Sequence, residues 1–259
     1  MKRWAIISTT QRCGSTWLAR ILGAMLESPF QYVEAAPLGF NLRELSAEAA
    51  STLFANQLRS LLTPPVLKTH DIPSRDFDSL ADALPEAKLF TISRNFKDVF
   101  ISRYFYARYH WETSPHLGAR PEHLNQALAP LDHLSDGDAL SALIPSPLLS
   151  FWARNWAAFE TKFSTRDAIR ITYEDMLSGA HQWRLEEFTG RQYVEPPSFL
   201  EFQDDESVKH GRFGHARFNR VGRHGQWKDW FTNEQSAIID SIALSAREEE
   251  ERLRENCPR

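Results

Sequence analysis

Short apolar runs alternate along this chain with segments in which apolar residues recur at helical spacing. The runs that predict buried strands are residues 4–8, 65–69, 88–92 and 168–173. The segments that predict helices are residues 16–22, 47–62, 95–109, 148–163 and 232–255. Strands that alternate with helices in this way predict an α/β fold with a central parallel sheet covered by helices on both faces.

One stretch, residues 111–149, departs from this alternation. It is rich in Pro, His, Leu and Ala, has weak periodicity, and is too long for an ordinary connection. It is either a lid or substrate-lining insertion, or an irregular helical excursion that packs on the core. Because the chain has no internal repeat, low-complexity tract or Gly/Ser linker, we expect a single domain over residues 1–259.

Composition and charge exclude several classes of protein. With 42% hydrophobic and 25% charged residues, the chain has the composition of a globular protein rather than of a disordered or coiled-coil one. A formal net charge of -4 argues against a nucleic-acid partner, because a phosphate backbone calls for a basic excess. No apolar run approaches the roughly 18 residues that a membrane-spanning helix needs.

The cysteine content bears on the cellular compartment. Cys13 and Cys257 lie at opposite ends of the chain and make no disulfide framework, which indicates a reducing, cytoplasmic location. The apolar stretch at the N-terminus ends at Ile7 and is followed by Arg12, so we do not expect a secretory signal. The histidines of residues 111–149 lack paired ligand spacing, and no metal site is expected.

The turn after the first strand, residues 9–16, has the composition of an anion-binding loop. Small residues there let backbone N–H groups point inward, and the N-terminus of the following helix adds positive potential. The turn differs from the P-loop of nucleoside triphosphatases, because Thr9 replaces its first glycine and Ser15 replaces its lysine. The alternative is a helix start that is merely capped by Ser15 or Thr16.

The second strand ends in Lys68 and Thr69 and is followed by His70. In open parallel sheets this carboxyl edge is where ligands bind. A histidine, with a reference pKa of about 6.5, can take a proton from a hydroxyl group near neutral pH. A lone histidine at a strand end is also compatible with a purely structural role.

The third strand leads into a predicted helix start. Asn95, with Asp98 three residues further on, has the pattern of a helix N-cap directly after Arg94. The planar guanidinium of an arginine at this edge can meet a phosphate with two hydrogen bonds. Taken alone, Lys97 and Asp98 would be a solvated charge pair and Ser102 an inert helix serine.

Five segments, in order, resemble motifs of the cytosolic sulfotransferases, and the matching pieces span residues 4–232. They are QRCGSTWL at 11–18 (the family's PKSGTTW-type loop), LKTHDIP at 67–73 (KTHLP), TISRNFKDVFIS at 91–102 (RNPKDVAVS), ITYEDML at 171–177 (YEDM) and FNRVGRHGQWKDWFT at 218–232 (FxRKGxxGDWKxxFT). The resemblance implies a P-loop-type three-layer α/β/α fold.

The resemblance also implies an activity. The enzyme would move a sulfuryl group from 3′-phosphoadenosine 5′-phosphosulfate (PAPS) to an acceptor hydroxyl or amine of a small molecule. His70 would be the general base, and Arg12 and Lys68 would balance charge on the sulfuryl group and the leaving phosphate. Since SO₃ carries less negative charge than a phosphoryl group, no metal is expected to be required.

The same resemblance assigns the nucleotide contacts. The implied residues are Arg12, Cys13, Gly14, Ser15, Thr16, Trp17, Arg94, Ser102, Tyr173, Arg220, Val221 and Gly222. Trp17 and Tyr173 would contact the adenine, and Arg94 and Ser102 the 3′-phosphate. Val221 replaces a family lysine that contacts this phosphate.

Several alternatives stay open. Arg223 is close enough in sequence to compensate for the missing lysine. Some sulfotransferase branches use a glutamate after the first helix as the base, which makes Glu34 a rival to His70. The family's dimer motif KxxxTVxxxE is here reduced to Lys228 and Thr232, so the chain is either a homodimer or a monomer.

Two other functions compete with sulfuryl transfer. One is a small-molecule kinase on the same fold, which would need Mg²⁺. The other is a module that binds PAPS or its product without chemistry. A stretch of the chain is dense in aromatic residues, and its helical spacing predicts that half or more of them lie in the core. If the others line the acceptor pocket, they favour a hydrophobic acceptor. The aromatic residues of this stretch are Phe100, Tyr104, Phe105, Tyr106, Tyr109 and Trp111.

Overall fold

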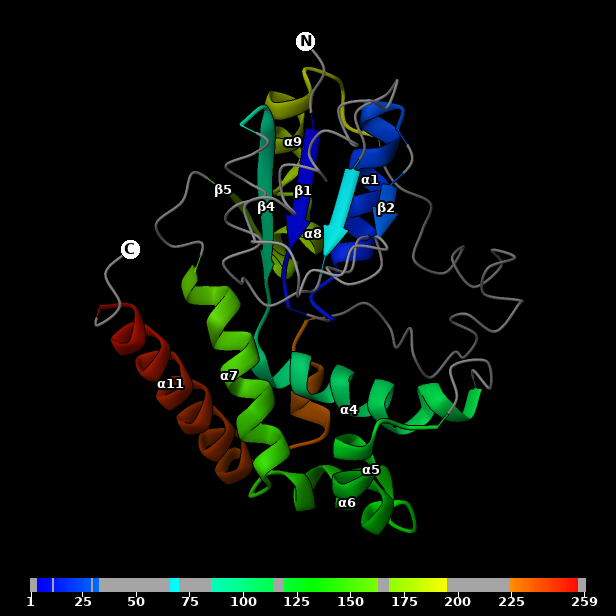
Figure 1. Cartoon of the computed structure of the whole chain (residues 1–259), viewed down its shortest axis with the longest axis vertical. Coiled ribbons are helices and arrows are strands. Elements are labelled where there is room, and N and C mark those ends of the chain that lie inside the picture. Colours follow the sequence, from blue (N-terminus) through cyan, green and yellow to red (C-terminus); the bar gives the residue numbers. More distant parts are fainter. Residues whose placement is uncertain are drawn as a thin grey trace, which may run out of the picture. The chain divides into compact units, whose positions relative to one another are not determined.

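The computed structural model describes residues 4–10, 12–28, 30–32, 66–69, 85–113, 119–162, 168–194 and 224–255 (Figure 1). The chain forms two compact units. Unit 1 consists of Met1–Ser93 and Ala158–Pro196, and unit 2 of Arg94–Ala157 and Pro197–Arg259. Each unit is built around its own set of elements.

Unit 1 contains a five-stranded sheet in the order β2-β3-β1-β4-β5. The strands are β1 (Trp4–Ser8), β2 (Phe30–Tyr32), β3 (Val66–Thr69), β4 (Ala87–Ser93) and β5 (Ala168–Thr172). Every pair of neighbours is parallel. The parallel α/β sheet predicted from the apolar runs is therefore confirmed.

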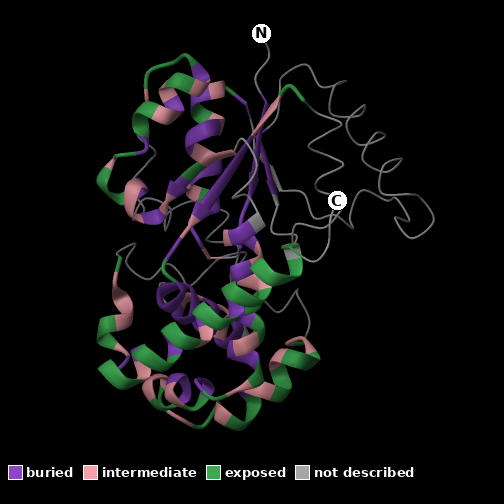
Figure 2. Ribbon diagram, turned by 90° about the vertical axis from the view of Figure 1, so that its left-hand side faces the viewer, coloured by how far each residue is buried: buried purple, intermediate pink, exposed green. Residues whose placement is uncertain are grey.

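The central strand β1 is buried over its whole length, as Figure 2 shows by its purple colour. Successive side chains of a strand point to opposite faces of the sheet. Because Ile6 and Ile7 are 1% and 0% exposed, both faces of the sheet are covered at its centre. This burial explains why β1 reads as a continuous apolar run rather than as an alternating one.

Three described helices belong wholly to unit 1, and the second of them has a complete cap at each end. They are α1 (Ser15–Leu26), α8 (Tyr173–Ser178) and α9 (Gln182–Thr189). Thr172 and Asp175 form a capping box at the start of α8, with N–H···O distances of 2.9 and 3.1 Å. Gly179 ends this helix in the left-handed conformation. The capping box fixes Tyr173 as the first residue of α8.

Unit 2 is helical where the structure describes it. Its elements are α4 (Phe96–Thr113), α5 (Glu122–Leu128), η2 (Ala129–Leu131), α6 (Asp136–Leu143), α7 (Pro147–Lys162, which ends in unit 1), η4 (Gln226–Asp229) and α11 (Asn233–Glu255). The buried face of α11 recurs at Ser236, Ile239, Ala243 and Ala246, the spacing of one helix stripe. The predicted helices at 95–109, 148–163 and 232–255 are confirmed.

The unusual segment 111–149 contains α5 and η2 over residues 122–131 and, after a turn, α6 over residues 136–143. Leu128, Leu140 and Leu143 from these elements are at most 1% exposed and belong to the core of unit 2. The described part of the segment is thus a packed helical excursion. Its role as a lid or in lining an acceptor site stays a prediction.

A partly buried cluster of hydrogen-bonded side chains connects this segment to α4. The phenol groups of Tyr104 and Tyr109 both donate to Asp136, at 2.9 and 2.6 Å. The Arg108 guanidinium binds the same carboxylate at 3.1 Å and donates to the carbonyls of Asp132 and Leu134. Burial raises the pKa of Tyr104, which keeps its hydroxyl protonated as a donor.

His181, between α8 and α9, gives unit 1 a pH-dependent stability. The residue is 1% exposed, and its Nδ1 lies 3.0 Å from the carbonyl oxygen of Asp175. Burial lowers the pKa of His181 below its usual value of 6.5. In the unfolded chain His181 therefore takes up a proton at a higher pH than in the fold. The free energy of unfolding should fall as the pH drops below about 6.5.

Urea unfolding of a His181→Gln variant between pH 7.5 and 5.0 checks this expectation. The variant should lose less stability over this range than the natural protein, because the titrating group is gone. His133→Gln, at an exposed position, is the matched control and should keep the natural slope. Equal slopes in the His181→Gln variant and the natural protein would contradict the assignment.

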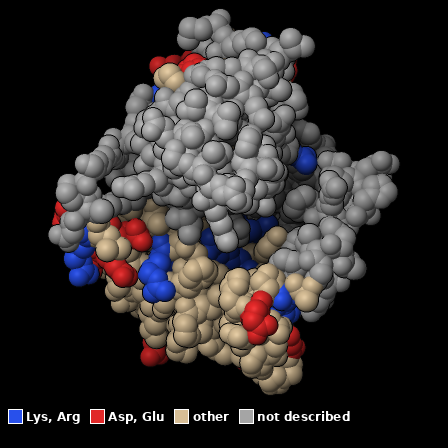
Figure 3. Space-filling view, in the orientation of Figure 1, with Lys and Arg blue, Asp and Glu red and all other residues tan. Residues whose placement is uncertain are grey.

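Among the described residues, no helix is both long and apolar enough to span a membrane. Figure 3 shows acidic and basic side chains interspersed at the left of the described surface, in keeping with the near balance of 30 basic and 34 acidic residues.

Candidate functional site

The carboxyl ends of the parallel strands place the predicted site residues of unit 1 along one edge of the sheet. The turn 9–14 follows β1, and Tyr173 follows β5. Ser8 at the end of β1 pairs with Thr69 at the end of β3. The Thr9 hydroxyl donates to the carbonyl of Ile92 in β4 at 2.6 Å, which fixes the start of the turn. Three neighbouring strands thus hold one turn at this edge.

The turn itself has the backbone of an anion cradle. Arg12 and Gly14 have φ angles of 72° and 95°, in the left-handed region. Left-handed residues within such a turn direct backbone N–H groups toward one point. Gly14 is the N-cap of α1, yet no side chain caps this helix and its first turn has no acidic residue. The alternative of a start merely capped by Ser15 or Thr16 is therefore wrong.

Lys68 on β3 brings a cation to this turn. Its side chain is 8% exposed, and Nζ donates to the Thr16 hydroxyl at 2.7 Å. Burial, together with the positive charges of Arg12 and Arg20, lowers the pKa of Lys68 to about 8. The charged form of a buried amine next to other cations is disfavoured by the loss of hydration and by charge repulsion. A bound anion would offset both effects, so this position of Lys68 favours anion binding.

Two aromatic side chains stand beside the turn. The rings of Trp17 on α1 and Tyr173 on α8 meet edge to face, with centroids 6.5 Å apart. The Tyr173 ring also packs against the backbone of Gly14, where a Cβ atom would lie 2.9 Å from its Cδ2. Cys13, between Arg12 and Gly14, is fully buried. A turn with left-handed backbone, a buried lysine and an aromatic pair are thus brought together in unit 1.

A methyl group at Gly14 should damage this turn. Gly14→Ala places a side chain at a φ of 95° and forces the Tyr173 ring to move. The left-handed conformation alone costs a non-glycine residue about 1–2 kcal/mol. We expect thermal unfolding to shift down by several degrees and anion binding at the turn to weaken.

Gly137→Ala is the matched control for this change. Gly137 lies in α6 with nothing within 4 Å of its added Cβ atom. Alanine at this helical position should be neutral or slightly stabilising. Differential scanning calorimetry of both variants measures the effect, and equal unfolding temperatures would refute the steric account of Gly14.

The N-terminus of α4 in unit 2 has the predicted cap. Asn95 Oδ1 accepts from the backbone N–H of Lys97 at 3.0 Å, so the helix begins directly after Arg94. Arg94 is 8% exposed, and its carbonyl oxygen accepts from the indole N–H of Trp156 at 3.1 Å. Ser102 lies two turns further along α4. Of the two residues implied as 3′-phosphate contacts, Arg94 lies just before α4 and Ser102 lies within it.

Lys97 and Asp98 are not the solvated charge pair that their sequence suggests. Lys97 is 5% exposed, and its Nζ donates to Ser236 and Asp240 of α11 at 2.9 and 2.7 Å. The same Nζ lies 3.9 Å from the centroid of the Trp227 ring. Asp98 is 1% exposed and is also bound to residues far away in sequence. Both charges are satisfied by the C-terminal elements of unit 2.

Most of the aromatic-dense stretch is core in unit 2, as its helical spacing indicates. Phe100, Tyr104 and Phe105 are at most 4% exposed, and Tyr109 packs against them. The Phe100 ring stacks on Phe231 with centroids 5.6 Å apart. These described aromatic side chains are therefore used mainly for core packing, and they give little support to the idea that the stretch lines an acceptor site.

Several predicted residues lie outside the described part of the chain. They are His70, Glu34, Arg220, Val221, Gly222 and Arg223. Their roles stay predictions, as does dimerisation. Sequence reasoning gave no role to Arg20, which raises the positive potential at Lys68. Its spacing of four residues from Thr16 on a helix could have revealed it.

Comparison with known proteins gives two findings. A model of the sulfotransferase domain matches residues 2–251. The chain also superimposes on solved structures. A mouse sulfotransferase complexed with PAP has a TM-score of 0.54 and 17% identity, with 95% of this chain and 83% of that chain covered. A retinol dehydratase in complex with androsterone and PAP has a TM-score of 0.55 and 15% identity, with 93% of this chain and 80% of that chain covered. These likenesses confirm the P-loop-type α/β fold.

Proposed function

Because the chain belongs to the family of proteins with a sulfotransferase domain, we propose that it transfers a sulfuryl group from PAPS to an acceptor hydroxyl or amine of a small, hydrophobic molecule. The observation that carries this proposal is the turn at Gly14. Its left-handed backbone, the uncapped start of α1 and the buried Lys68 beside it support the binding of a phosphosulfate group here.

The residues of the turn bind the 5′ end of the nucleotide in this proposal. Backbone N–H groups at Gly14, Ser15 and Thr16 face the phosphosulfate, where the helix N-terminus favours negative charge. Arg12 and Lys68 supply full positive charges. The edge-to-face pair of Trp17 and Tyr173 offers apolar surface for an adenine ring.

In this proposal the 3′-phosphate is bound by Arg94, just before α4, and by Ser102 within α4. A guanidinium can hold a phosphate with two charge-assisted hydrogen bonds, and a hydroxyl can donate a third. Arg220 and Gly222 complete this set by the resemblance, with Val221 contributing no cation. This phosphate distinguishes PAPS from nucleotides that carry only a 5′ group.

The chemistry is an in-line displacement at sulfur. The acceptor oxygen forms a bond to sulfur while the bond from sulfur to the bridging phosphate oxygen breaks. His70 takes the proton that the acceptor hydroxyl loses. Arg12 and Lys68 stabilise the negative charge that develops on the departing phosphate. No metal takes part in this scheme, and the reaction takes place in the cytoplasm.

Binding and turnover test the proposal. Titration calorimetry in buffer with chelator should show saturable binding of adenosine 3′,5′-bisphosphate, the product PAP. A screen of phenols, alcohols and amines with labelled PAPS should then show transfer. Absence of PAP binding would overturn the proposal. Binding without transfer to any acceptor would instead favour the non-catalytic module, and Mg²⁺-dependent phosphoryl transfer from ATP would favour the kinase.

A further inference from the structure

Trp156 on α7 is bound to the residue that stands just before α4. Its indole N–H donates to the backbone carbonyl of Arg94 at 3.1 Å, across 62 residues of the chain. Both residues belong to unit 2. The indole N–H is the one polar group of a tryptophan side chain, and it is a donor only. This bond therefore commits Trp156 to the backbone of Arg94.

The carbonyl of Arg94 lies at a junction between two elements. Arg94 follows Ser93, the last residue of β4, and precedes Asn95, the N-cap of α4. The backbone N–H of Val99 donates to the carbonyl of Asn95 at 3.1 Å, so the helical ladder begins one residue after Arg94. Buried backbone carbonyls are nearly always hydrogen-bonded. Trp156 gives the Arg94 carbonyl a donor and so fixes the peptide plane that follows Arg94.

The ring of Trp156 is in turn held by α4. Phe96, the first residue of this helix, has its ring centroid 5.4 Å from that of Trp156, with 43° between the ring planes. Phe96 is 4% exposed, and Trp156 is a partly buried neighbour of the same core. Trp156 thus contacts the residues on both sides of the N-cap, Arg94 through its N–H group and Phe96 through its ring.

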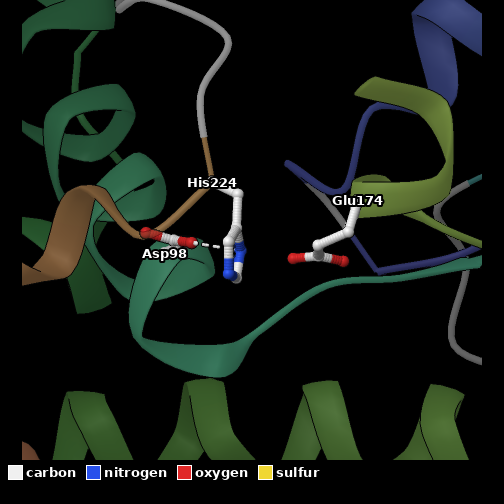
Figure 4. A group of neighbouring side chains, drawn as sticks. All are labelled: Asp98, Glu174 and His224. Carbon is white, nitrogen blue, oxygen red and sulfur yellow. Dashed lines mark ion pairs between the residues drawn. The ribbon is translucent and has the colours of Figure 1, made fainter. Parts of the chain in front are cut away.

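The C-terminal elements of unit 2 fix the first turn of α4 as well. The Asp98 carboxylate accepts from the backbone N–H groups of Gly225 and Trp227 at 2.9 and 3.2 Å. Figure 4 shows this carboxylate on α4, with the imidazole of His224 3.7 Å away. The helix start is therefore firmly placed, and the bond from Trp156 fixes the residue that precedes it.

We propose that Trp156 is a positioning residue for the 3′-phosphate of the nucleotide, because it holds the backbone of Arg94 in the orientation from which the guanidinium meets this phosphate. The inference rests on the proposed function and adds a residue to it. Arg94 is 8% exposed, so its direction within the packed surroundings depends on the orientation of its backbone. A donor that is held in place before binding loses less conformational entropy on binding, which raises the affinity.

Affinities for two nucleotides test the proposal. Calorimetry should compare PAP with adenosine 5′-monophosphate (AMP), which lacks only the 3′-phosphate. Trp156→Phe keeps an aromatic ring beside Phe96 and removes the N–H group. We expect it to weaken PAP binding about two- to tenfold, the contribution of one hydrogen bond, and to leave AMP binding unchanged. An unchanged ratio of the two affinities would overturn the proposal.

Trp152→Phe is the matched control. Trp152 lies one turn earlier on α7, is 5% exposed, and has its ring centroid 6.0 Å from that of Phe100. The change removes the same ring volume from the core without touching the carbonyl of Arg94. It should lower the unfolding temperature and leave the ratio of PAP to AMP affinity as it is. An equal fall of the ratio in both variants would attribute the effect to packing and refute the proposal.

A second variant covers the case in which Trp156→Phe does not fold. Trp156→Met also lacks the donor, and a methionine side chain adapts to irregular space in a core. It should lower the ratio of PAP to AMP affinity in the same way. A folded Trp156→Met with the natural ratio would count against the proposal just as an unchanged Trp156→Phe would.

A double-mutant cycle checks that Trp156 acts through Arg94. In a protein that carries Arg94→Ala, adding Trp156→Phe should leave the ratio of PAP to AMP affinity unchanged, because the guanidinium that Trp156 positions is gone. A further fall as large as the one in the natural protein would mean that Trp156 acts independently of Arg94. The positioning role would then be wrong.

The same measurements separate a failure of this inference from a failure of the proposed function. If the natural protein binds PAP no better than AMP, it has no site for a 3′-phosphate and both fail. If it prefers PAP and keeps the full preference in Arg94→Ala, Trp156 has no contact to act through and only the inference fails. If Arg94→Ala lowers the preference and Trp156→Phe does not, the 3′-phosphate site stands and the role of Trp156 is refuted.

Discussion

His70→Ala should lower the turnover number by about 10²–10⁴-fold, the contribution typical of a general base. The imidazole that is proposed to take the proton of the acceptor hydroxyl is then missing. In the sequence, His70 directly follows Thr69, the last residue of β3. Steady-state rates with PAPS and a saturating acceptor measure the loss. PAP affinity should stay nearly unchanged.

Glu34→Ala is the decisive companion to this variant. Full activity in His70→Ala combined with a loss in Glu34→Ala would move the base from the histidine to the glutamate. Loss of activity in both, with PAP binding intact in both, would mean that the two side chains act on the same proton. Only a loss confined to His70→Ala supports the assignment made above.

Lys68→Ala should lower turnover by about 10²–10³-fold, as expected when a charged donor to a developing anion is removed. Lys68 is buried and donates to Thr16 on the first turn of α1, so its ammonium group is held at the anion turn. The loss should appear mainly in kcat, because the charge on the leaving phosphate develops during the reaction.

The pH profile gives a second measurement of the same residue. With a pKa of about 8, Lys68 loses its charge in the free enzyme above this pH. The value of kcat/KM should therefore decline above pH 8 in the natural protein, and this limb should be absent in Lys68→Ala. Lys88→Ala, at the amino end of β4 and so at the other edge of the sheet, is the control. A matching loss in Lys88→Ala would show that the effect is not local.

Sequence patterns predicted the strand, the turn and the helix start of the candidate site, because each depends on interactions between residues that are close together in the sequence. The apolar run of β1 predicts a strand, and the structure has it. The small residues after it predict an anion-binding turn; the structure has a turn with left-handed backbone at Arg12 and Gly14, and its binding of an anion stays a prediction. Asn95 predicts the start of α4 because an N-cap acts on the backbone two residues away. In each case the residues that make the interaction lie close together in the chain.

Long-range contacts could not be predicted in this way. Asp98 binds Gly225, which lies 127 residues away, and Lys97 binds Asp240 at a separation of 143 residues. Periodicity says nothing of such partners, so both residues read as surface charges although they are buried. The contact of the Tyr173 ring with Gly14 is of the same kind, because it depends on how β5 is placed in the sheet.

The burial of Lys97 constrains how the protein can be re-engineered. Its ammonium group is shielded from water, and its carboxylate and hydroxyl partners both belong to α11. Asp240 itself is largely exposed, but truncation before it would leave the buried ammonium group of Lys97 without its carboxylate partner, and a buried charge without a partner is destabilising. Expression variants and fusion junctions should therefore leave this last helix whole.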